Sequence, residues 1–300
     1  MIALLAPGQG SQTPGMLGPW LDEPEAKEQL AAWSETTGLD LVRLGTTAEA
    51  DEIKDTAVTQ PLVVAASLLA AARLGDRLPA DAPVAGHSVG EIAAAAAAGV
   101  LTPDAAVALA AVRGREMAAA CALEETGMSA VLGGDPDEVL ARLAELGLDA
   151  ANRNGAGQVV AAGPVAALAE LAAAPPERAR VVALPVAGAF HTRFMAPAQE
   201  ALRAHAAGVA TADPVRSLLS NADGTVVTDG AEALRRLVDQ VTRPVRWDAC
   251  MDALRGLGVT ATVELPPAGA LTGLVKRALK GTSTLPLKTP DDLGKIGAGA

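Results

Sequence analysis

The sequence predicts an α/β protein in which a small domain is inserted into a larger one. From Met1 to about Leu123, short apolar segments alternate with alanine-rich stretches, which is typical of a parallel sheet covered by helices on both faces. The order then becomes β-α-β-β-α-β up to Pro185, the split βαβ arrangement of a ferredoxin-like unit. After Gly188 the first pattern returns. We therefore expect a large domain over 1–123 and 189–290, a small domain over 124–188, and a flexible tail over 291–300.

Each element follows from its local pattern. Met1–Ala6 is apolar and runs directly into Pro7-Gly8 without a basic segment before it, so it predicts a first strand and not a signal peptide. Gln60–Leu74 predicts a long buried helix. Thr102-Pro103-Asp104 predicts the start of another, with threonine as N-cap and proline at the first helical position. The later strands are expected at 129–132, 149–153, 158–162, 179–185, 215–220 and 261–265, and the later helices at 136–146, 164–173, 197–207, 231–241, 248–256 and 271–279.

Composition excludes several classes of function. Half of the 300 residues are apolar, yet no window approaches the ~20 apolar residues that a membrane span requires. The net charge of −11 argues against a nucleic-acid surface. The two cysteines, Cys121 and Cys250, lack metal-type spacing and predict reduced thiols, so we expect a cytoplasmic protein without a metal site.

The segment Gly86-His87-Ser88-Val89-Gly90 predicts a serine nucleophile. Apolar residues precede it as a strand end would, and the alanine-rich segment Glu91–Ala98 follows it as a helix. Flanking glycines permit a tight turn, and the helix N-terminus favours developing negative charge beside Ser88. A bare G-x-S-x-G motif also occurs by chance, so a purely structural turn is the alternative.

Only three histidines could serve Ser88 as a base. His87 is adjacent on a tight turn and is expected to support it, and His205 falls on a charged helix surface. His191 lies where the small domain returns to the large one, which makes it our candidate general base, with a structural histidine as the alternative. Both phenylalanines, Phe190 and Phe194, lie within three residues of it and suggest a pocket wall, or else a part of the core.

No carboxylate follows from the sequence as the partner of His191. An α/β-hydrolase would place its histidine near the C-terminus, and none follows His205. A backbone carbonyl or an amide could orient the ring instead.

Arg113 lies on an i, i+4, i+8 stripe with Leu109 and Met117 and is therefore expected to be partly buried. A buried guanidinium requires an anionic partner and suits a carboxylate well. A structural glutamate and a substrate carboxylate are equally compatible with the spacing. The neighbouring Arg115 falls on another, solvated face.

A set of motifs occurs in one order along nearly the whole chain. They are Pro7–Gln12, Thr59–Pro61, Gly86–Glu91, Arg113–Arg115, Asn154–Val160, Gly188–Thr192, Asn221–Gly224, Arg243–Trp247 and Leu271–Leu274. On these motifs the chain resembles the malonyl-CoA:acyl-carrier-protein transacylases of type II fatty-acid and polyketide systems. The chain departs from that pattern at Leu265–Gly269, where the family has a glycine-rich turn, and at Ala187, where a serine is common.

The resemblance implies a large α/β-hydrolase-like domain and a role for each matched residue. Ser88 would be the acylated nucleophile, His191 its base, and the carbonyl of Gln240 the group that orients the ring. The backbone N–H groups of Gln9 and Val89 would form the oxyanion hole. The implied substrate-binding residues are Arg113, which would clamp the malonyl carboxylate, Met117, Phe190 and Asn154.

The implied reaction moves malonyl from malonyl-CoA to the phosphopantetheine thiol of a holo-acyl carrier protein, with no tightly bound cofactor and no metal. The bulk of Phe190 predicts malonyl over methylmalonyl. Malonyl-CoA and the carrier protein are the expected partners, without nucleic acid or membrane, and nothing demands more than a monomer. Two alternatives remain open: a serine esterase or thioesterase, and a non-catalytic module that binds the carrier protein.

Overall fold

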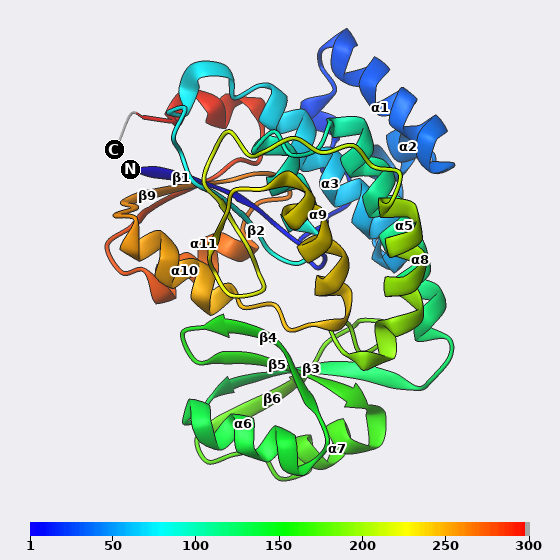
Figure 1. The fold of residues 1–300 in the computed structure, drawn as a ribbon, viewed down its shortest axis with the longest axis vertical. Helices are drawn as coiled ribbons and strands as arrows, with labels where there is room; N and C mark the ends of the chain where they lie inside the picture. Colours follow the sequence, from blue (N-terminus) through cyan, green and yellow to red (C-terminus); the bar gives the residue numbers. More distant parts are fainter. Residues whose placement is uncertain (298–300) are drawn as a thin grey trace.

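Two sheets form the framework of the protein in the computed structural model, which describes residues 1–297 (Figure 1). The larger sheet has the order β10-β9-β1-β2-β7-β8, and its neighbours are parallel except for the pair β7 and β8. Its strands are β1 Ile2–Ala6, β2 Val84–Gly86, β7 Leu218–Leu219, β8 Val226–Val227, β9 Ala261–Glu264 and β10 Ser283–Pro286. A mixed α/β fold with a parallel sheet is thereby confirmed.

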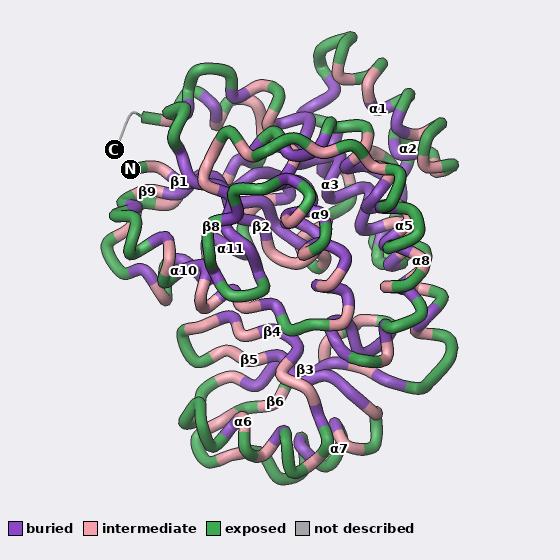
Figure 2. Tube along the Cα trace, in the orientation of Figure 1, coloured by how far each residue is buried: buried purple, intermediate pink, exposed green. Residues whose placement is uncertain are grey.

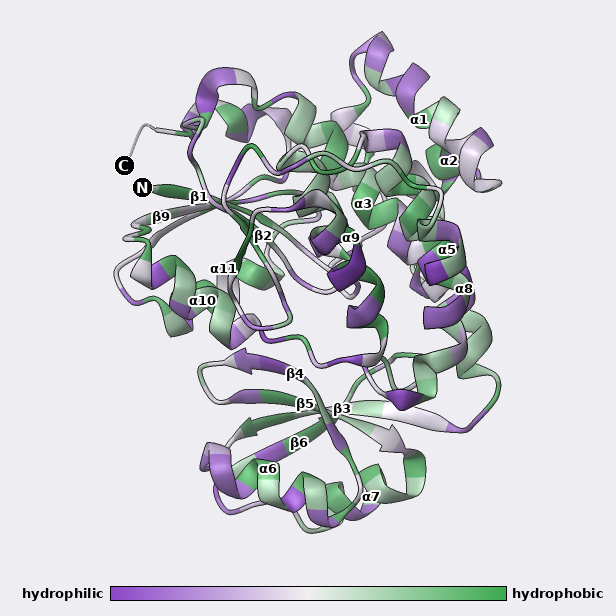
Figure 3. Ribbon diagram, viewed as in Figure 1, coloured by the Kyte–Doolittle hydropathy of each residue, from purple (hydrophilic) through white to green (hydrophobic). Residues whose placement is uncertain are grey.

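Helices cover both faces of this sheet. The helices outside the smaller sheet are α1 Pro24–Thr37, α2 Leu41–Thr46, α3 Thr56–Ala72, α4 Gly90–Ala97, α5 Pro103–Cys121, α8 Ala196–Ala206, α9 Gly230–Asp239, α10 Trp247–Gly256 and α11 Ala270–Ala278. Successive side chains of β1 point to opposite faces. Ala3 and Leu5 pack with α10 and α11, whereas Leu4 and Ala6 belong to the cluster that includes α3, α4 and α5. Figure 2 shows the resulting buried centre, and Figure 3 shows that β1 and β2 are apolar.

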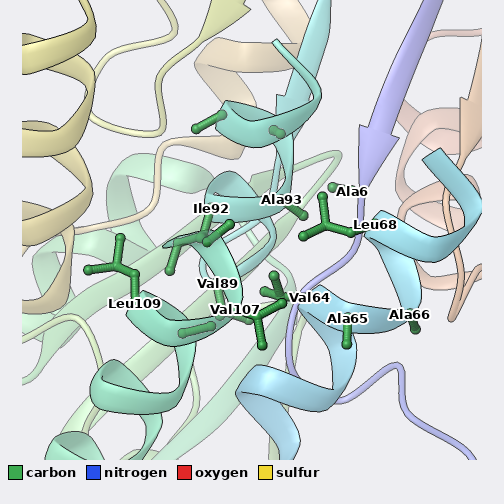
Figure 4. Close-up of a cluster of buried hydrophobic side chains, with 14 of the residues drawn as sticks. Ala6, Val64, Ala65, Ala66, Leu68, Val89, Ile92, Ala93, Val107 and Leu109 are labelled. Atoms are coloured by element: carbon green, nitrogen blue, oxygen red, sulfur yellow. The ribbon is translucent and has the colours of Figure 1, made fainter. Parts of the chain in front are cut away.

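The packing of α3, α4 and α5 relies on small side chains. Figure 4 shows Val64 and Leu68 of α3 beside Ile92 and Ala93 of α4, with Val107 of α5 close by. Alanine lets helices approach closely while burying no polar group. The alanine-rich run after Ser88 therefore forms a helix that is buried from Gly90 to Ala95 and partly exposed at Ala96 and Ala97.

The smaller sheet has the order β4-β5-β3-β6, with all neighbours antiparallel. Its elements are β3 Thr126–Gly133, α6 Pro136–Glu145, β4 Asp149–Gly155, β5 Gln158–Pro164, α7 Val165–Ala173 and β6 Ala179–Ala183. Val131 of β3 faces the core under α6 and α7, whereas Met128 points to the opposite face and joins the main cluster. The β-α-β-β-α-β order expected from the sequence is confirmed.

The two sheets are joined through one edge strand. The N–H of Arg153 in β4 donates to the carbonyl of Val245 at 2.9 Å, and the N–H of Val245 donates to the carbonyl of Ala151 at 2.8 Å. Val245 lies just before α10. The open face of the smaller sheet is therefore held against the carboxyl ends of the larger sheet's strands (Figure 1).

Several expected boundaries need correction. The strand expected at 215–220 is reduced to Leu218–Leu219, because the Val215 N–H donates to Ala98 and its side chain is 77% exposed. The strands β8 and β10 and the helices α1 and α2 were not individually expected. The long buried helix begins at Thr56, where Asp55 caps it by accepting the N–H of Ala57 at 2.8 Å.

The segment expected to be a flexible tail, 291–300, begins inside a short helix. Pro290–Lys295 forms a 3₁₀ helix whose Leu293 is buried, and the Asp292 carboxylate accepts the N–H of Thr289 at 3.1 Å. Residues 298–300 lie outside the described residues. Among the helices within residues 1–297, none is both long enough and apolar enough to cross a membrane.

Candidate active site

The turn between β2 and α4 carries Ser88 in a left-handed backbone conformation. Its φ is 55°, in a region that residues with a side chain rarely adopt. The flanking glycines leave no room for a side chain: a Cβ on Gly86 would lie 2.1 Å from the carbonyl oxygen of Gly90, and a Cβ on Gly90 would lie 2.3 Å from that of Ala6. The glycines used to predict a tight turn are therefore required by close backbone contacts.

The side chain of Asn221 holds this turn in place. Its Oδ1 accepts the N–H of Ser88 at 2.9 Å, and its Nδ2 donates to the carbonyl of Gly86 at 2.8 Å. Asn221 is fully buried. In the sequence Asn221 stood out only as part of a motif, without a predicted role. Its place soon after β7, at the carboxyl end of a parallel strand, was the available signal.

His191 lies within hydrogen-bonding distance of Ser88. Its Nε2 is 2.7 Å from the Ser88 Oγ, and its Nδ1 is 2.8 Å from the backbone oxygen of Gln240. A carbonyl can only accept, so Nδ1 carries the proton and Nε2 accepts from the serine hydroxyl. Burial, followed by the nearby Arg113 charge, lowers the pKa of His191 to about 3. The imidazole is therefore neutral at pH 7 and able to take a proton.

The other two histidines have the surroundings expected of them. His87 lies with Nε2 2.8 Å from the Asn154 Oδ1, and its ring meets that of Trp247 edge-on at 5.6 Å between centroids. Burial lowers the pKa of His87. Its carbonyl accepts the N–H of Gly90 at 3.0 Å, within the turn itself. His205 is exposed on α8.

Arg113 is 1% exposed and is held by amide oxygens. One guanidinium NH₂ donates to the Gln60 Oε1 at 2.7 Å, and the other donates to the Gln240 Oε1 at 3.0 Å and lies 3.4 Å from the Ser88 Oγ. Burial lowers the pKa of Arg113 to about 10, so it stays charged at pH 7. The sequence left open a structural glutamate or a substrate carboxylate; among the described residues no carboxylate lies within salt-bridge distance of this guanidinium.

A cavity of about 210 Å³ separates these groups from the open face of the smaller sheet. The predicted site residues on its wall are Gln9, Ser88, Arg113, Met117, Asn154, Phe190 and His191. Val89 and Gln240 lie behind the wall, Val89 with its side chain in the core (Figure 4). Phe194 does not line the cavity; its ring lies 4.5 Å from the Arg193 guanidinium, so only one of the two phenylalanines forms the expected wall.

The loop after β1 brings Gln9 to the same cavity. A Cβ on Gly8 would lie 2.5 Å from the His87 carbonyl, so glycine allows this loop to contact the serine turn. The backbone N–H groups of Gln9 and Val89 donate to no other group of residues 1–297. Both N–H groups are therefore unpaired among these residues.

Two more buried polar residues surround the site without a role predicted from the sequence. Gln60 binds Arg113, and Glu91 accepts from the backbone of Asn221 at 3.0 Å and from the Gln240 side chain. Burial raises the pKa of Glu91 to about 7. A lone glutamate in an alanine run was a signal that could have identified Glu91. Within residues 1–297, no group of three or more His, Cys, Asp or Glu side chains is arranged to bind a metal.

Comparison with known proteins agrees with this geometry. The model of the acyl transferase domain family matches residues 4–291. The chain is 62% identical over 299 residues to the malonyl CoA-acyl carrier protein transacylase of Mycobacterium tuberculosis, covering 99% of each protein. The chain belongs to the malonyl-CoA:acyl-carrier-protein transacylase family. The resemblance stated from the motifs is confirmed.

Solved structures of this transacylase family share the whole fold. The crystal structure of the M. tuberculosis protein superposes with a TM-score of 0.96 at 61% identity, covering 99% of each chain. A malonyl-transacylase solved in complex with its type II polyketide acyl-carrier protein gives a TM-score of 0.92 at 28% identity, covering 100% of this chain and 99% of that one. This transacylase fold is therefore matched along its full length.

Proposed function

We propose that the protein transfers a malonyl group from malonyl-CoA to the phosphopantetheine thiol of a holo-acyl carrier protein through a malonyl ester on Ser88. One observation carries the choice of acyl group. The charged guanidinium of Arg113 lies 3.4 Å from the nucleophilic oxygen and is held by neutral amides, so its charge is available to a substrate carboxylate.

The first half-reaction forms the ester. His191 takes the proton of the Ser88 hydroxyl as the serine oxygen attacks the thioester carbonyl of malonyl-CoA. The backbone N–H groups of Gln9 and Val89 stabilise the oxyanion, each contributing about 3 kcal/mol. The tetrahedral intermediate collapses by breaking the C–S bond, and the proton on His191 passes to the departing CoA thiolate.

The second half-reaction reverses these roles. The phosphopantetheine thiol gives its proton to His191, its sulfur attacks the ester, and Ser88 recovers its proton as the C–O bond breaks. No oxidant, metal or tightly bound cofactor takes part. The same chemistry supplies extender units for fatty-acid or polyketide synthesis.

Side chains around the cavity select the acyl group. Arg113 binds the malonyl carboxylate, and Met117 and Phe190 form apolar walls beside it. Asn154 and His87 both line the cavity, and the Asn154 side chain is hydrogen-bonded to the His87 ring. Asn154 therefore contributes to substrate binding directly and by fixing the position of that ring. The bulk of Phe190 favours malonyl over methylmalonyl.

We also propose that the chain is organised as two domains. The large domain, 1–123 and 189–290, is α/β-hydrolase-like in placing its serine on a strand-turn-helix. The small domain, 124–188, is ferredoxin-like in its strand order. The open face of its sheet forms one wall of the cavity that Ser88 also lines. We further propose a cytoplasmic monomer with free thiols at Cys121 and Cys250.

Intact-mass spectrometry tests this function. The protein is mixed with malonyl-CoA, its mass is followed, and holo-carrier protein is then added. A malonyl adduct that is absent in Ser88→Ala and moves to the carrier is the expected result. Rapid loss of the adduct to water before carrier is added would indicate an esterase, and no adduct would indicate a binding module; either result overturns the proposal.

A further inference from the structure

Glu91 is a buried carboxylate that the acyl-transfer steps above do not use. It is the second residue of α4, is 4% exposed, and does not line the cavity. Each of its oxygens has a different partner. Oε1 accepts the backbone N–H of Asn221 at 3.0 Å, and Oε2 accepts from the side-chain Nε2 of Gln240. Its two partners are the residues that hold Ser88 and Arg113.

The first connection runs through the amide of Gln240. A carboxylate accepts hydrogen bonds, so the NH₂ end of this amide faces Glu91 and its oxygen faces Arg113. If the amide were reversed, its NH₂ group would face the guanidinium, which also only donates. Glu91 therefore fixes which end of Gln240 supports Arg113. The intervening amide also keeps the carboxylate from pairing directly with the guanidinium.

The second connection runs through Asn221. Its backbone N–H is anchored on Glu91, while its side chain accepts from the Ser88 N–H and donates to the Gly86 carbonyl. The left-handed backbone of Ser88 is sterically unfavourable on its own and needs such surrounding contacts. Glu91 therefore fixes the residue that supports the nucleophile turn.

We propose that Glu91 is a positioning residue of the active site, which orients Arg113 through Gln240 and the Ser88 turn through Asn221. The Nε2 of Gln240 also lies 3.3 Å from the Ser88 carbonyl oxygen and 3.2 Å from the Asn221 Oδ1, but the Ser88 N–H is held by the Asn221 side chain. A glutamine at position 91 can still accept from Asn221, but its NH₂ group opposes that of Gln240. An alanine at this position breaks both connections. Only the assignment of malonyl to Arg113 rests on the proposed function.

The test compares E91Q and E91A with wild type in two assays. Transfer from malonyl-CoA and from acetyl-CoA gives the selectivity, and the rate of Ser88 labelling by a fluorophosphonate reports the nucleophile turn without either substrate. For E91Q we expect malonyl kcat/KM to fall about tenfold or more, mainly through KM, with acetyl transfer and labelling within about twofold. For E91A we expect labelling and both transfers to fall together.

E264Q is the matched control. Glu264 is equally buried and accepts the backbone N–H groups of Leu271 and Thr272 at 2.9 and 2.8 Å, but it lies outside the cavity. This variant is expected to lower thermal stability without changing the malonyl-to-acetyl ratio. A ratio that changes equally in E264Q and E91Q, or that does not change in E91Q, overturns the proposal. A wild-type protein that labels normally but transfers no malonyl contradicts the proposed function instead, and labelling of E91A still tests Glu91.

A double variant covers the case in which E91Q does not fold. In E91Q/Q240E the amide and the acid exchange places, so the total charge and the hydrogen bonds donated by the Asn221 N–H and by Arg113 are retained, whereas the donations from position 240 to the Ser88 carbonyl and the Asn221 Oδ1 are lost. The carboxylate then lies directly against Arg113 and competes with the malonyl group. We expect loss of the malonyl preference, measured as the malonyl-to-acetyl ratio of kcat/KM. A preserved malonyl preference in this variant would show that the position of the carboxylate does not matter and would overturn the proposal.

Discussion

Nδ1 of His191 lies 2.8 Å from the backbone carbonyl oxygen of Gln240, so the proposed base is oriented by main chain and not by a carboxylate. The side chain of the same glutamine accepts from Arg113 at 3.0 Å. Gln240 therefore has two functions. Its main chain serves proton transfer, and its side chain serves the cation that we propose binds malonyl, with longer contacts from its Nε2 to the Ser88 carbonyl at 3.3 Å and to the Asn221 Oδ1 at 3.2 Å.

Gln240→Ala should separate these two functions. The carbonyl that orients His191 remains, so acetyl transfer is expected to stay within about threefold of wild type. Arg113 loses an acceptor, and malonyl kcat/KM is expected to fall about tenfold or more. Steady-state kinetics with both thioesters measure the difference. Equal losses for the two substrates would mean that the side chain acts on the base as well.

Arg113→Ala should abolish most of the preference for a carboxylated acyl group. Loss of one partner of a buried charge pair typically costs several kcal/mol, so we expect malonyl kcat/KM to fall about 100-fold or more. Acetyl transfer should fall much less. Arg115→Ala is the control, because Arg115 lies two residues away on α5, exposed and paired with Glu116 at 2.9 Å. Comparable losses for malonyl and acetyl would falsify the carboxylate clamp.

His191→Ala should slow acylation of Ser88 by roughly 10³-fold or more, the scale seen when the base of a serine nucleophile is removed. The adduct on Ser88 is followed by intact mass after mixing with malonyl-CoA. His205→Ala is the control, since that histidine is exposed on α8 and should acylate at the wild-type rate. A fast adduct in the His191 variant would assign the base elsewhere.

The residues with a strong local signal were the ones that the sequence could identify. Ser88 has its glycines, His191 is one of three histidines, and Arg113 interrupts an apolar helical stripe. The structure brings these three together. The start of α5 was likewise predictable, because Thr102 accepts the N–H of Ala105 and Pro103 follows it. Residues adjacent in the sequence determine both the N-cap of α5 and the turn that carries Ser88.

The supporting residues were not predictable in the same way. The contacts of Asn221 and Gln240 with Glu91 join positions 130 and 149 residues apart, so the local pattern could single out a residue such as Glu91 but not the partners that it binds. The strand β7 was overestimated because nothing in the local sequence at Val215 shows that its backbone N–H bonds to Ala98, just after α4. Long-range hydrogen bonding, more than hydrophobic pattern, completes this site.

Gly86→Ala and Gly90→Ala should destabilise the protein and reduce Ser88 reactivity together. In each case the new methyl group would lie within 2.3 Å of a backbone oxygen. Relieving this clash would require the backbone of the strand or of the helix to shift, which destabilises the packed core. We expect a loss of about 2 kcal/mol or more in the free energy of unfolding, measured with urea. Gly256→Ala is the control: a Cβ there meets nothing within 4 Å, so stability should be unchanged or raised.

The pH dependence of stability should carry opposite contributions from His191 and Glu91. Burial lowers the pKa of His191 from 6.5 to about 3, so the unfolded chain binds this proton more readily, and stability falls as the pH drops from 6.5 towards 3. Burial raises the pKa of Glu91 from 4.5 to about 7, opposed first by its hydrogen bonds from Asn221, Gln240 and Ser220 and then by the charge of Arg113. The folded chain then binds that proton more readily, and stability falls as the pH rises from 4.5 to 7.

Urea unfolding of wild type and E91Q between pH 5 and 8 separates the Glu91 contribution. Two other ionisable groups interact electrostatically with Glu91, namely Arg113 and the Cys250 thiol of α10. Burial and the charge of Glu91 raise the pKa of the Cys250 thiol, so this thiol stays neutral throughout this pH range. Removing the carboxylate should flatten the decline above pH 5 by roughly 3 kcal/mol at most. His191 is present in both proteins, so its contribution cancels and the difference between the two profiles belongs to Glu91. A wild-type profile as flat as that of E91Q across this range would mean that Glu91 is ionised in the folded protein as easily as in the unfolded chain.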